Sequence, residues 1–282
     1  MLKSGFHLLR DVEVPWLLYG TAWKEERTEL LTTQALAAGF VGIDTANQRK
    51  HYFEAGVGAA LASALASGKR RENLFLQTKF TFLGGQDHRL PYTKQAPIAT
   101  QVDESMQSSL SHLGTRYVDS YVLHGPSQRS GLGSADWEAW RAMEGLQRAG
   151  QARYLGVSNV SLEQLQALQA GASVKPRFVQ NRCYAERGWD REVRRFCDEH
   201  GLIYQGFSLL TANRRELAST QLKGLAVKLG RSVPELVFRF AIDVGMLPLT
   251  GTTSREHMQL DLKCSEFELS AQDVSAIERI AA

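Results

Sequence analysis

The sequence predicts a closed (β/α)8 TIM barrel with an N-terminal β-hairpin and a C-terminal helix. Short runs rich in β-forming residues alternate with longer amphipathic patterns, and such alternation indicates a parallel sheet with crossover helices. Eight such strands occur in a chain of 282 residues, and eight strand–helix units are typical of a barrel of roughly 250 residues. A doubly wound open sheet also fits the alternation, but the strand count favours a barrel that forms a single domain over residues 1–282.

The eight predicted strands are short. In chain order they span residues 16–19, 41–44, 74–80, 118–124, 153–158, 178–181, 202–207 and 246–250. Between them, apolar residues recur at helical spacing, most clearly over residues 25–38, 55–67, 98–113, 137–149, 162–169 and 191–200. This order predicts a barrel whose strands all run in one direction.

The two ends of the chain and two loops complete the predicted architecture. Residues 6–14 predict a short hairpin that closes one end of the barrel, and residues 269–282 predict a closing helix. Residues 84–93 and 125–134 are polar, glycine-rich and long for loops that follow strands. Because such loops build the active sites of barrels, we expect both of them to border the functional site.

Composition excludes several classes of function. The 33 Lys and Arg residues and the 30 Asp and Glu residues leave a formal charge of +3, with the signs interspersed. The sequence lacks the basic stripe of a nucleic-acid-binding protein. It also lacks a signal peptide and any apolar run of roughly 18 residues, so we expect no membrane association.

The three cysteines are widely spaced along the chain. Cys183, Cys197 and Cys264 form no CxxC motif and have no histidine pair at metal-binding spacing. Neither a disulfide framework nor a zinc site is therefore favoured. We expect reduced thiols, no bound metal and a cytoplasmic location.

Four of the apolar strands end in polar side chains. Asp44, Lys79 and His124 each follow an apolar run, and Ser158 with Asn159 ends a fourth strand. Each alone has an ordinary explanation, since an Asp caps helices, a Lys reaches solvent and a His packs in cores. Together they favour an active site, because side chains at the ends of barrel strands meet at one rim.

These residue types fit the reduction of a carbonyl group. A Lys79 ammonium paired with Asp44 favours the ionised form of a nearby phenol, and Tyr52 in the next loop supplies that phenol. We therefore expect Tyr52 to donate a proton to a carbonyl oxygen that His124 orients by a hydrogen bond. No side chain donates hydride, so a nicotinamide cofactor is required.

Six stretches of sequence occur in a recognisable order. They are Tyr-Gly-Thr-Ala-Trp at 19–23, Gly-Ile-Asp-Thr-Ala at 42–46, Gln-Thr-Lys at 77–79, Val-Leu-His-Gly-Pro at 122–126, Gly-Val-Ser-Asn at 156–159 and Val-Gln-Asn at 179–181. In this order and spacing the chain resembles the aldo-keto reductases over nearly its whole length. The resemblance implies a monomeric barrel that reduces small aldehydes or ketones with NADPH. It also implies a catalytic set of Asp, Tyr, Lys and His, which correspond here to Asp44, Tyr52, Lys79 and His124.

The position of the catalytic tyrosine departs from the family pattern. The family usually places it five residues after the Asp, where this sequence has Arg49, and residues 47–50 resemble an insertion. Counting back from the following helix leaves His51 or Tyr52, depending on where the gap is placed. We choose Tyr52, because only a phenol has the required acid chemistry.

The resemblance also implies a cofactor pocket. Ser158, Asn159 and Gln180 correspond to residues that bind the nicotinamide carboxamide, and Asn181 takes the place of Gln180 if the register slips by one. Phe207 corresponds to an aromatic that stacks on the nicotinamide, with plain core packing as the alternative. The loop that contains Ser208 and Leu210 is expected to pass near the pyrophosphate.

Residues 247–257 resemble the family's phosphate-binding segment, which leads into a helix N-terminus. Gly251, Thr252 and Thr253 offer backbone N–H groups and hydroxyls there. The family's usual Lys is absent, and His257 stands where an Arg is common. Arg255 is then the best candidate for the 2′-phosphate, with a solvated residue at a helix start as the alternative. We expect a modest preference for NADPH, with NADH also possible.

Two other functions compete with a reductase. A cofactor-binding, redox-sensing regulatory subunit, resembling the β subunits of potassium channels, shares this fold, but the four catalytic residue types favour the enzyme. A metal-dependent hydrolase needs several His and carboxylate side chains at the rim, where we find only His124 and Asp44. Gly125 stands where many family members carry a Trp, which indicates room for a bulky carbonyl substrate beside Trp23 and Phe53.

Overall fold

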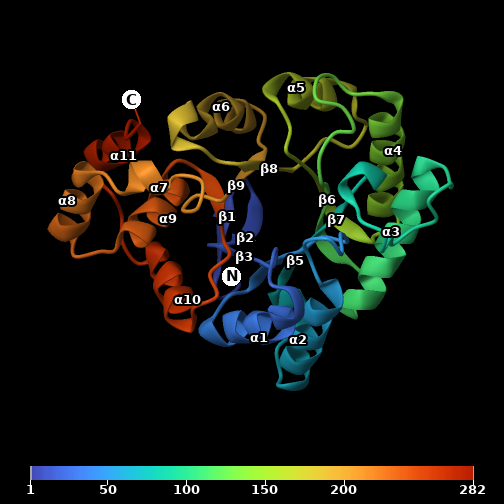
Figure 1. Ribbon diagram of the computed structural model, residues 1–282, viewed down its shortest axis with the longest axis horizontal. Helices are drawn as coiled ribbons and strands as arrows, with labels where there is room; N and C mark the ends of the chain where they lie inside the picture. Colours follow the sequence, from blue (N-terminus) through green and yellow to red (C-terminus); the bar gives the residue numbers. More distant parts are fainter. Residues whose placement is uncertain (1, 282) are drawn as a thin grey trace.

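A computed structural model describes residues 2–281. In this part of the chain eight parallel strands close into a barrel in the order β10-β3-β4-β5-β6-β7-β8-β9 (Figure 1). They are β3 (Leu18–Gly20), β4 (Gly42–Asp44), β5 (Phe75–Phe80), β6 (Val118–Leu123), β7 (Ala152–Ser158), β8 (Phe178–Arg182), β9 (Ile203–Phe207) and β10 (Met246–Thr250). Each coincides with a predicted strand, and the predicted closed barrel is confirmed.

The N-terminal hairpin covers the end of the barrel at which the strands begin. Strand β1 (Phe6–Leu9) pairs antiparallel with β2 (Val12–Pro15) through a two-residue turn at Arg10 and Asp11. Both turn residues have left-handed φ angles, of 48° and 63°, as tight hairpin turns require. The hairpin contributes Phe6, Val12 and Val14 to a buried cluster with residues at the starts of barrel strands, among them Leu18, Phe75 and Phe178. The predicted hairpin is therefore present and closes this end.

Eleven α-helices in residues 2–281 surround the barrel (Figure 1). They are α1 (Thr28–Ala38), α2 (Glu54–Ala66), α3 (Ile98–Leu113), α4 (Ser134–Arg148), α5 (Leu162–Gly171), α6 (Arg191–Glu199), α7 (Arg214–Leu217), α8 (Thr220–Leu229), α9 (Val233–Asp243), α10 (Arg255–Leu262) and α11 (Ala271–Glu278). The six helices predicted with bounds correspond to α1 to α6. Among these helices we find none with the length and apolar character needed to cross a lipid bilayer.

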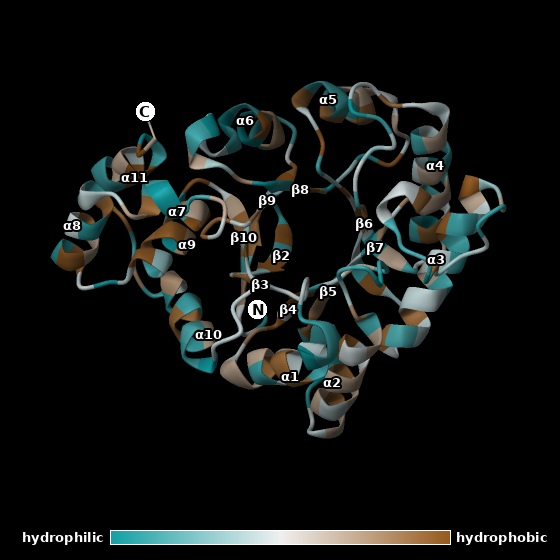
Figure 2. Ribbon diagram, viewed as in Figure 1, coloured by the Kyte–Doolittle hydropathy of each residue, from teal (hydrophilic) through white to brown (hydrophobic). Residues whose placement is uncertain are grey.

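Helix α9 was not predicted. Its residues from Glu235 to Ala241 are all buried, including the charged Glu235 and Arg239, so this stretch has no solvent-exposed polar face (Figure 2). An amphipathic pattern cannot reveal a helix that is covered on all sides. The signal that marks its start is the cap, in which Ser232 accepts a hydrogen bond from the Glu235 backbone and Pro234 follows in the first turn.

The C-terminal helix is shorter than the predicted range of residues 269–282. Helix α11 begins after Ser270, whose side chain accepts a hydrogen bond from the backbone of Asp273, and it ends at Glu278. This side-chain cap fixes the start two residues later than predicted. Ala282 lies outside the described residues.

The cysteines are buried in the core. Cys183, Cys197 and Cys264 are free thiols, and burial raises the pKa of both Cys183 and Cys197 to about 12. Since the thiolate is the reactive form, these side chains are chemically quiet at neutral pH.

Strand register brings one layer of polar side chains together inside the barrel. Asp44 pairs with Gln77 across β4 and β5. On the other side Gln180 lies between Ser158 of β7 and Gln205 of β9. All five side chains are buried, and Asp44 and Ser158 are the last residues of their strands. The barrel therefore presents polar groups at the rim where barrel active sites form.

Close packing of α2 against α3 depends on Gly58. A Cβ atom at this position would lie 1.8 Å from the carbonyl oxygen of His112, which is backbone and cannot rotate away. This contact explains a glycine inside a helix, where the residue otherwise costs stability. In contrast, a Cβ at Gly224 of α8 would meet no atom within 4 Å.

We predict opposite effects for two glycine-to-alanine substitutions at the fifth residue of a helix. Gly58→Ala should lower the free energy of unfolding by about 2–3 kcal/mol, because α2 must move away from α3. Gly224→Ala should raise it by about 0.5–1 kcal/mol, because alanine favours the helix and meets no obstacle. Urea unfolding followed by circular dichroism measures both values. Similar effects of the two substitutions would contradict the packing assigned to Gly58.

Candidate active site

A cavity of about 1020 Å³ opens at the end of the barrel where the strands end. Most of the predicted site residues line it, namely Asp44, Tyr52, His124, Ser158, Asn159, Gln180, Phe207, Ser208, Leu210, Gly251, Thr252 and Thr253. Lys79 is fully buried against Asp44 and does not reach the surface of the cavity. Arg255 is exposed and also lies outside the lining.

The loops that line the cavity differ from those predicted. Residues 84–93 and 125–134 contribute nothing to the lining, which comes instead from residues near 20–24, 48–52, 207–211 and 249–253. Arg89, Leu90 and Pro91 line a second cavity of about 310 Å³, which shares Gln48 and Tyr52 with the first. The second loop is held over α5, where Gln164 donates hydrogen bonds to two of its carbonyl oxygens. Loop length and glycine content indicate an exposed loop but do not show toward which side it folds.

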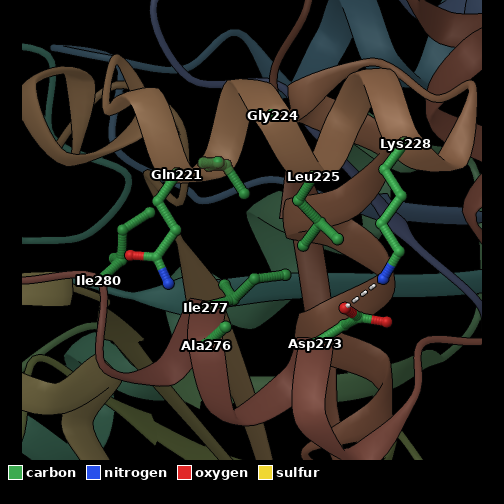
Figure 3. Close-up of a pocket in the computed structure, with 9 residues that line it drawn as sticks. Gln221, Gly224, Leu225, Lys228, Asp273, Ala276, Ile277 and Ile280 are labelled. Atoms are coloured by element: carbon green, nitrogen blue, oxygen red, sulfur yellow. Dashed lines mark ion pairs between the residues drawn. The ribbon is translucent and has the colours of Figure 1, made fainter.

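A groove of about 220 Å³ between α8 and α11 has a different character (Figure 3). Its walls include Leu225, Ile277 and Ile280, and its only ion pair joins Lys228 Nζ to Asp273 Oδ1 at 3.6 Å. None of the predicted site residues lies there. Residues 2–281 contain no group of three or more His, Cys, Asp or Glu placed to hold a metal ion. The cavity at the strand ends is therefore the candidate site.

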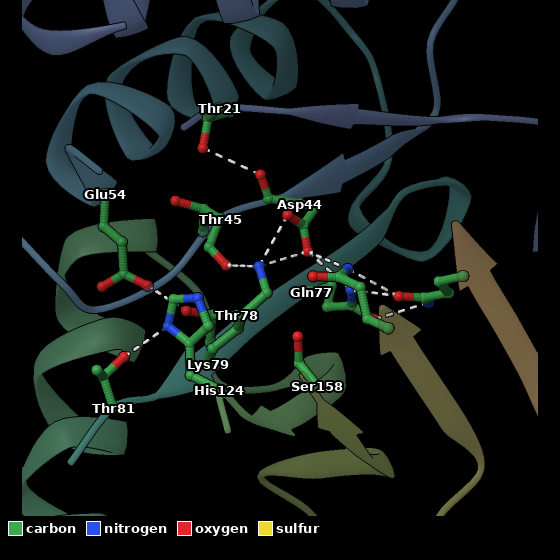
Figure 4. Close-up of polar contacts among 12 residues, drawn as sticks. Thr21, Asp44, Thr45, Glu54, Gln77, Thr78, Lys79, Thr81, His124 and Ser158 are labelled. Carbon is green, nitrogen blue, oxygen red and sulfur yellow. Dashed lines mark hydrogen bonds and ion pairs between the residues drawn. The ribbon is translucent and has the colours of Figure 1, made fainter. Parts of the chain in front are cut away.

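A buried ion pair forms the floor of this site (Figure 4). Lys79 Nζ donates to both carboxylate oxygens of Asp44, at 2.7 and 2.8 Å, and to the carbonyl oxygen of Thr45 at 2.8 Å. These three bonds use all three ammonium protons. Burial lowers the pKa of Lys79, and the Asp44 carboxylate opposes that effect. A buried pair is stable only when its remaining hydrogen-bonding groups are also satisfied, as they are here.

Tyr52, and not His51, lies beside the other predicted catalytic residues. The Tyr52 ring centre is 5.1 Å from Lys79 Nζ and 5.8 Å from the ring centre of His124. His51 instead packs on Trp23, with ring centres 3.9 Å apart. The geometry therefore favours the gap placement that aligns Tyr52 with the family tyrosine.

The ionisation of Tyr52 differs from the expectation. We expected the Lys79 ammonium to favour the phenolate, but burial and the Asp44 carboxylate raise the pKa of Tyr52 well above its ordinary value. The reason is that Asp44 and Thr45 take the ammonium protons, so the Lys79 charge acts chiefly on Asp44. Tyr52 therefore keeps its proton at neutral pH.

His124 is a neutral imidazole. Burial and the nearby Lys79 charge lower its pKa to about 3. Its Nδ1 is 2.7 Å from the hydroxyl of Thr81, which leaves Nε2 as the remaining polar atom of the ring. A neutral imidazole has one N–H donor, and the Thr81 contact decides which nitrogen carries it.

The neighbouring strand ends hold polar groups in constrained geometry. Asn159 has a left-handed φ of 52°, and its Nδ2 donates to the carbonyl oxygen of His124 at 2.8 Å and to Ser158 Oγ at 3.1 Å. Ser208 is also left-handed, with φ of 57°. Non-glycine residues in this region carry strain, and such strain clusters at functional sites.

The structure also distinguishes Gln180 from Asn181. Gln180 lines the cavity, whereas Asn181 turns away to bond the backbone of Val160 in both directions. Phe207 lines the cavity and is half-buried, so it is not a plain core residue.

The segment before α10 places His257, and not Arg255, in the lining of the cavity. The two residues are two positions apart on one helix, which turns their side chains about 200° from each other. Only one of them can therefore face the cavity. Thr252 and Thr253 line the cavity beside His257, and Ser254 caps the helix by accepting a hydrogen bond from the His257 backbone.

Comparison with known proteins agrees with this geometry. The sequence model of the family described as "Aldo/keto reductase family" matches residues 16–282. The chain belongs to the aldo/keto reductase family. It is 28% identical to an uncharacterized oxidoreductase, YtbE, of Bacillus subtilis, over 99% of this chain and 93% of that protein. It is 27% identical to an NADPH-dependent alpha-keto amide reductase of Saccharomyces cerevisiae, over 93% and 84%.

Solved structures of aldo-keto reductases share the fold. An aldo/keto reductase of Brucella melitensis has a TM-score of 0.81 at 27% identity and covers 98% of both chains. The Bombyx mori enzyme solved with NADP has a TM-score of 0.82 at 23% identity, over 99% of this chain and 94% of that one. This aldo-keto reductase is therefore an oxidoreductase with the family's barrel.

Sequence reasoning missed several polar residues of the reductase site. Lys24 lines the cavity, donates to the carbonyl oxygen of Gly251 at 2.9 Å, and has its pKa lowered by burial to about 8. Arg182 also lines the cavity, with its guanidinium 5.6 Å from the ring centre of Phe207. Lys24 and Arg182 each directly follow one of the six stretches that resemble the family. This adjacency is the signal in the sequence that could have indicated them.

We predict that His124 makes the reductase less stable in acid. An unfolded histidine binds a proton near pH 6.5, whereas His124 in the folded chain stays neutral to about pH 3. The unfolded state therefore binds more protons between these values, and stability falls with pH by at most about 1.4 kcal/mol per unit. Urea unfolding at pH 7 and pH 5 should show a smaller loss in His124→Gln than in the wild type. An identical loss in both proteins would rule out this role of His124.

Proposed function

We propose that this chain reduces aldehydes or ketones to alcohols with NADPH, taking the proton from Tyr52. The observation on which this depends is the position of the protonated Tyr52 phenol next to neutral His124 and the buried Lys79 ammonium. The named relatives support the same chemistry, since the yeast protein is an NADPH-dependent reductase and another, from Bacillus subtilis, is a glyoxal reductase.

The cavity suits a dinucleotide in size and chemistry. Ser158, Asn159, Gln180 and Phe207 would hold the nicotinamide end, and Ser208 and Leu210 would lie along the pyrophosphate. Gly251, Thr252, Thr253 and His257 would hold the phosphate of the adenosine end near the start of α10. When bound, the reduced cofactor supplies a hydride. The chain must then supply the proton and a fixed position for the carbonyl group.

Tyr52 and His124 perform these two tasks in the proposed reaction. If the Thr81 hydroxyl donates to Nδ1, the proton of His124 is on Nε2, which can donate a hydrogen bond to the carbonyl oxygen. The Tyr52 phenol is protonated at neutral pH, so it holds a proton that can pass to that oxygen as negative charge develops there. The Lys79 ammonium lies 5.1 Å from the ring centre, but its charge is largely offset by Asp44, so it stabilises the remaining phenolate only in part.

The mouth of the cavity indicates a substrate with an apolar body. Trp23 is 68% exposed and packs on His51 at the rim, with a left-handed φ of 62°. Gly125 and Phe53 do not reach the lining, and Phe53 instead packs under Arg49, 4.1 Å from its guanidinium carbon. Because Gly125 lies outside the lining, the room that it was expected to leave for a bulky substrate stays a prediction.

We predict that the purified protein quenches NADPH fluorescence and oxidises NADPH when 4-nitrobenzaldehyde is added. Tyr52→Phe keeps the ring but removes the transferable proton, so turnover should fall by about 10² or more with NADPH binding retained. Absorbance at the NADPH band and fluorescence titration measure the two quantities.

The matched control is His51→Gln, which removes the ring that packs on Trp23 and should lower turnover far less. Greater loss in His51→Gln than in Tyr52→Phe would show that the acid is misassigned. NADPH binding without turnover across aldehydes and ketones would favour the regulatory subunit instead.

We predict that His257, and not Arg255, contributes to recognition of the 2′-phosphate. His257→Ala should weaken NADPH binding by roughly three- to tenfold, the effect of one lost hydrogen bond, and leave NADH binding nearly unchanged. Arg255→Ala should change either affinity by less than about twofold, because its side chain lies outside the cavity. Calorimetric titration with both cofactors measures this, and the reverse result would restore the assignment to Arg255.

A further inference from the structure

Two glutamines face each other inside the barrel without a role in the proposed reaction. Gln77 of β5 and Gln205 of β9 are fully buried and lie 128 residues apart in the chain. Each donates to the other, Gln77 Nε2 to Gln205 Oε1 at 2.8 Å and Gln205 Nε2 to Gln77 Oε1 at 2.9 Å. A reciprocal amide pair in this position links opposite parts of the barrel.

The pair is connected to the candidate active site through Asp44, beside which Figure 4 shows Gln77, and through Gln180. Gln77 Nε2 also donates to Asp44 Oδ1 at 2.7 Å. Gln180 Nε2 donates to Gln205 Oε1 at 2.9 Å and to Asp44 Oδ1 at 3.1 Å. We call Gln77, Gln205 and Gln180 the amide chain.

The charge of Asp44 decides the orientation of every amide in this chain. An ionised carboxylate only accepts hydrogen bonds, so Gln77 and Gln180 must both present their NH2 groups to it. Gln205 Oε1 then receives one bond from each of them, and Gln205 Nε2 must point to Gln77 Oε1. Rotating any one amide by half a turn would exchange its NH2 group and its oxygen, and would place two NH2 groups or two oxygen atoms next to each other.

The side-chain amide of Gln180 is therefore held in one orientation. Both protons of its Nε2 are used, by Asp44 and Gln205, and its carbonyl oxygen is the only polar atom of the amide left for a ligand in the cavity. Such an oxygen accepts hydrogen bonds and cannot donate them. This end of the cavity is thus selective for a ligand group that carries an N–H.

We propose that Gln77 and Gln205 are positioning residues, which fix the Gln180 amide so that its oxygen selects the NH2 of the nicotinamide carboxamide. The inference rests on the proposed function, since it assumes a nicotinamide at this end of the cavity. Stability alone does not account for the pair, because two buried amides contribute little more than apolar side chains of similar volume.

The test compares binding of NADP⁺ with binding of its 3-acetylpyridine analogue, in which a methyl group replaces the carboxamide NH2. Isothermal titration calorimetry gives both dissociation constants, and their ratio measures selection for the N–H. Wild type should favour NADP⁺ by roughly tenfold, the effect of one hydrogen bond. Gln205→Met should reduce this ratio to below threefold, because Gln180 then keeps only its 3.1 Å bond to Asp44 and has a free Nε2 proton that can meet an acceptor on the ligand.

The matched control is Gln101→Met. Gln101 is also buried, but its Nε2 donates to the backbone of Lys94 and Ala96 outside the cavity, so the ratio should remain at the wild-type value. If Gln205→Met fails to fold, the double variant Gln77→Leu with Gln205→Leu is used. It removes both amides of the pair, so that no unpaired buried amide of the pair remains. This double variant should also give a ratio below threefold.

The outcomes separate the positioning role from the proposed function. Retention of the wild-type ratio in Gln205→Met or in the double variant overturns the positioning role and leaves the proposed function intact. A wild type that binds both ligands equally well also overturns only the positioning role. A wild type that binds neither ligand overturns both.

Discussion

The carboxylate of Asp44 is the constraint around which the inner end of the cavity is arranged. It lies inside the barrel, almost without exposure, and accepts hydrogen bonds from Lys79, Gln77 and Gln180. Because a carboxylate cannot donate, each of these neighbours must turn a proton toward it. The same charge keeps the Lys79 protons away from Tyr52 and adds to the effect of burial, which is the larger cause of the raised pKa of that phenol. One buried group thus determines the ionisation and the orientation of its neighbours.

Features that depend on short stretches of sequence were predicted well. The barrel strands were found because each is a local run of β-forming residues, and Asp44, Lys79 and His124 because a polar residue after such a run is visible in the sequence. Pairings made by barrel closure have no such signal. Gln77 and Gln205 are 128 residues apart, and nothing near either one indicates the other.

The remaining differences come from orientation and environment. Arg255 was favoured for its phosphate chemistry, but the turn of α10 places His257 in the lining of the cavity, and which of the two binds the 2′-phosphate stays a prediction. The pKa of Tyr52 was predicted from one neighbour, Lys79, whereas burial and Asp44 together determine it. In both cases the prediction used the chemistry of the residue type alone. The direction of the side chain and the pKa of the phenol depend on surroundings that only the folded chain defines.

The N-terminal hairpin has a consequence for the sequence of events in the proposed reaction. Because β1 and β2 cover the barrel where its strands begin, ligands reach the cavity from the opposite end, where the exposed Trp23 lies at the rim. A nicotinamide held by Gln180 and Phe207 would occupy its inner end, and the carbonyl compound would then lie nearer the entrance. If the carbonyl compound covers the nicotinamide, the dinucleotide would bind before it and leave after the alcohol, and its departure can then limit how fast the cycle repeats.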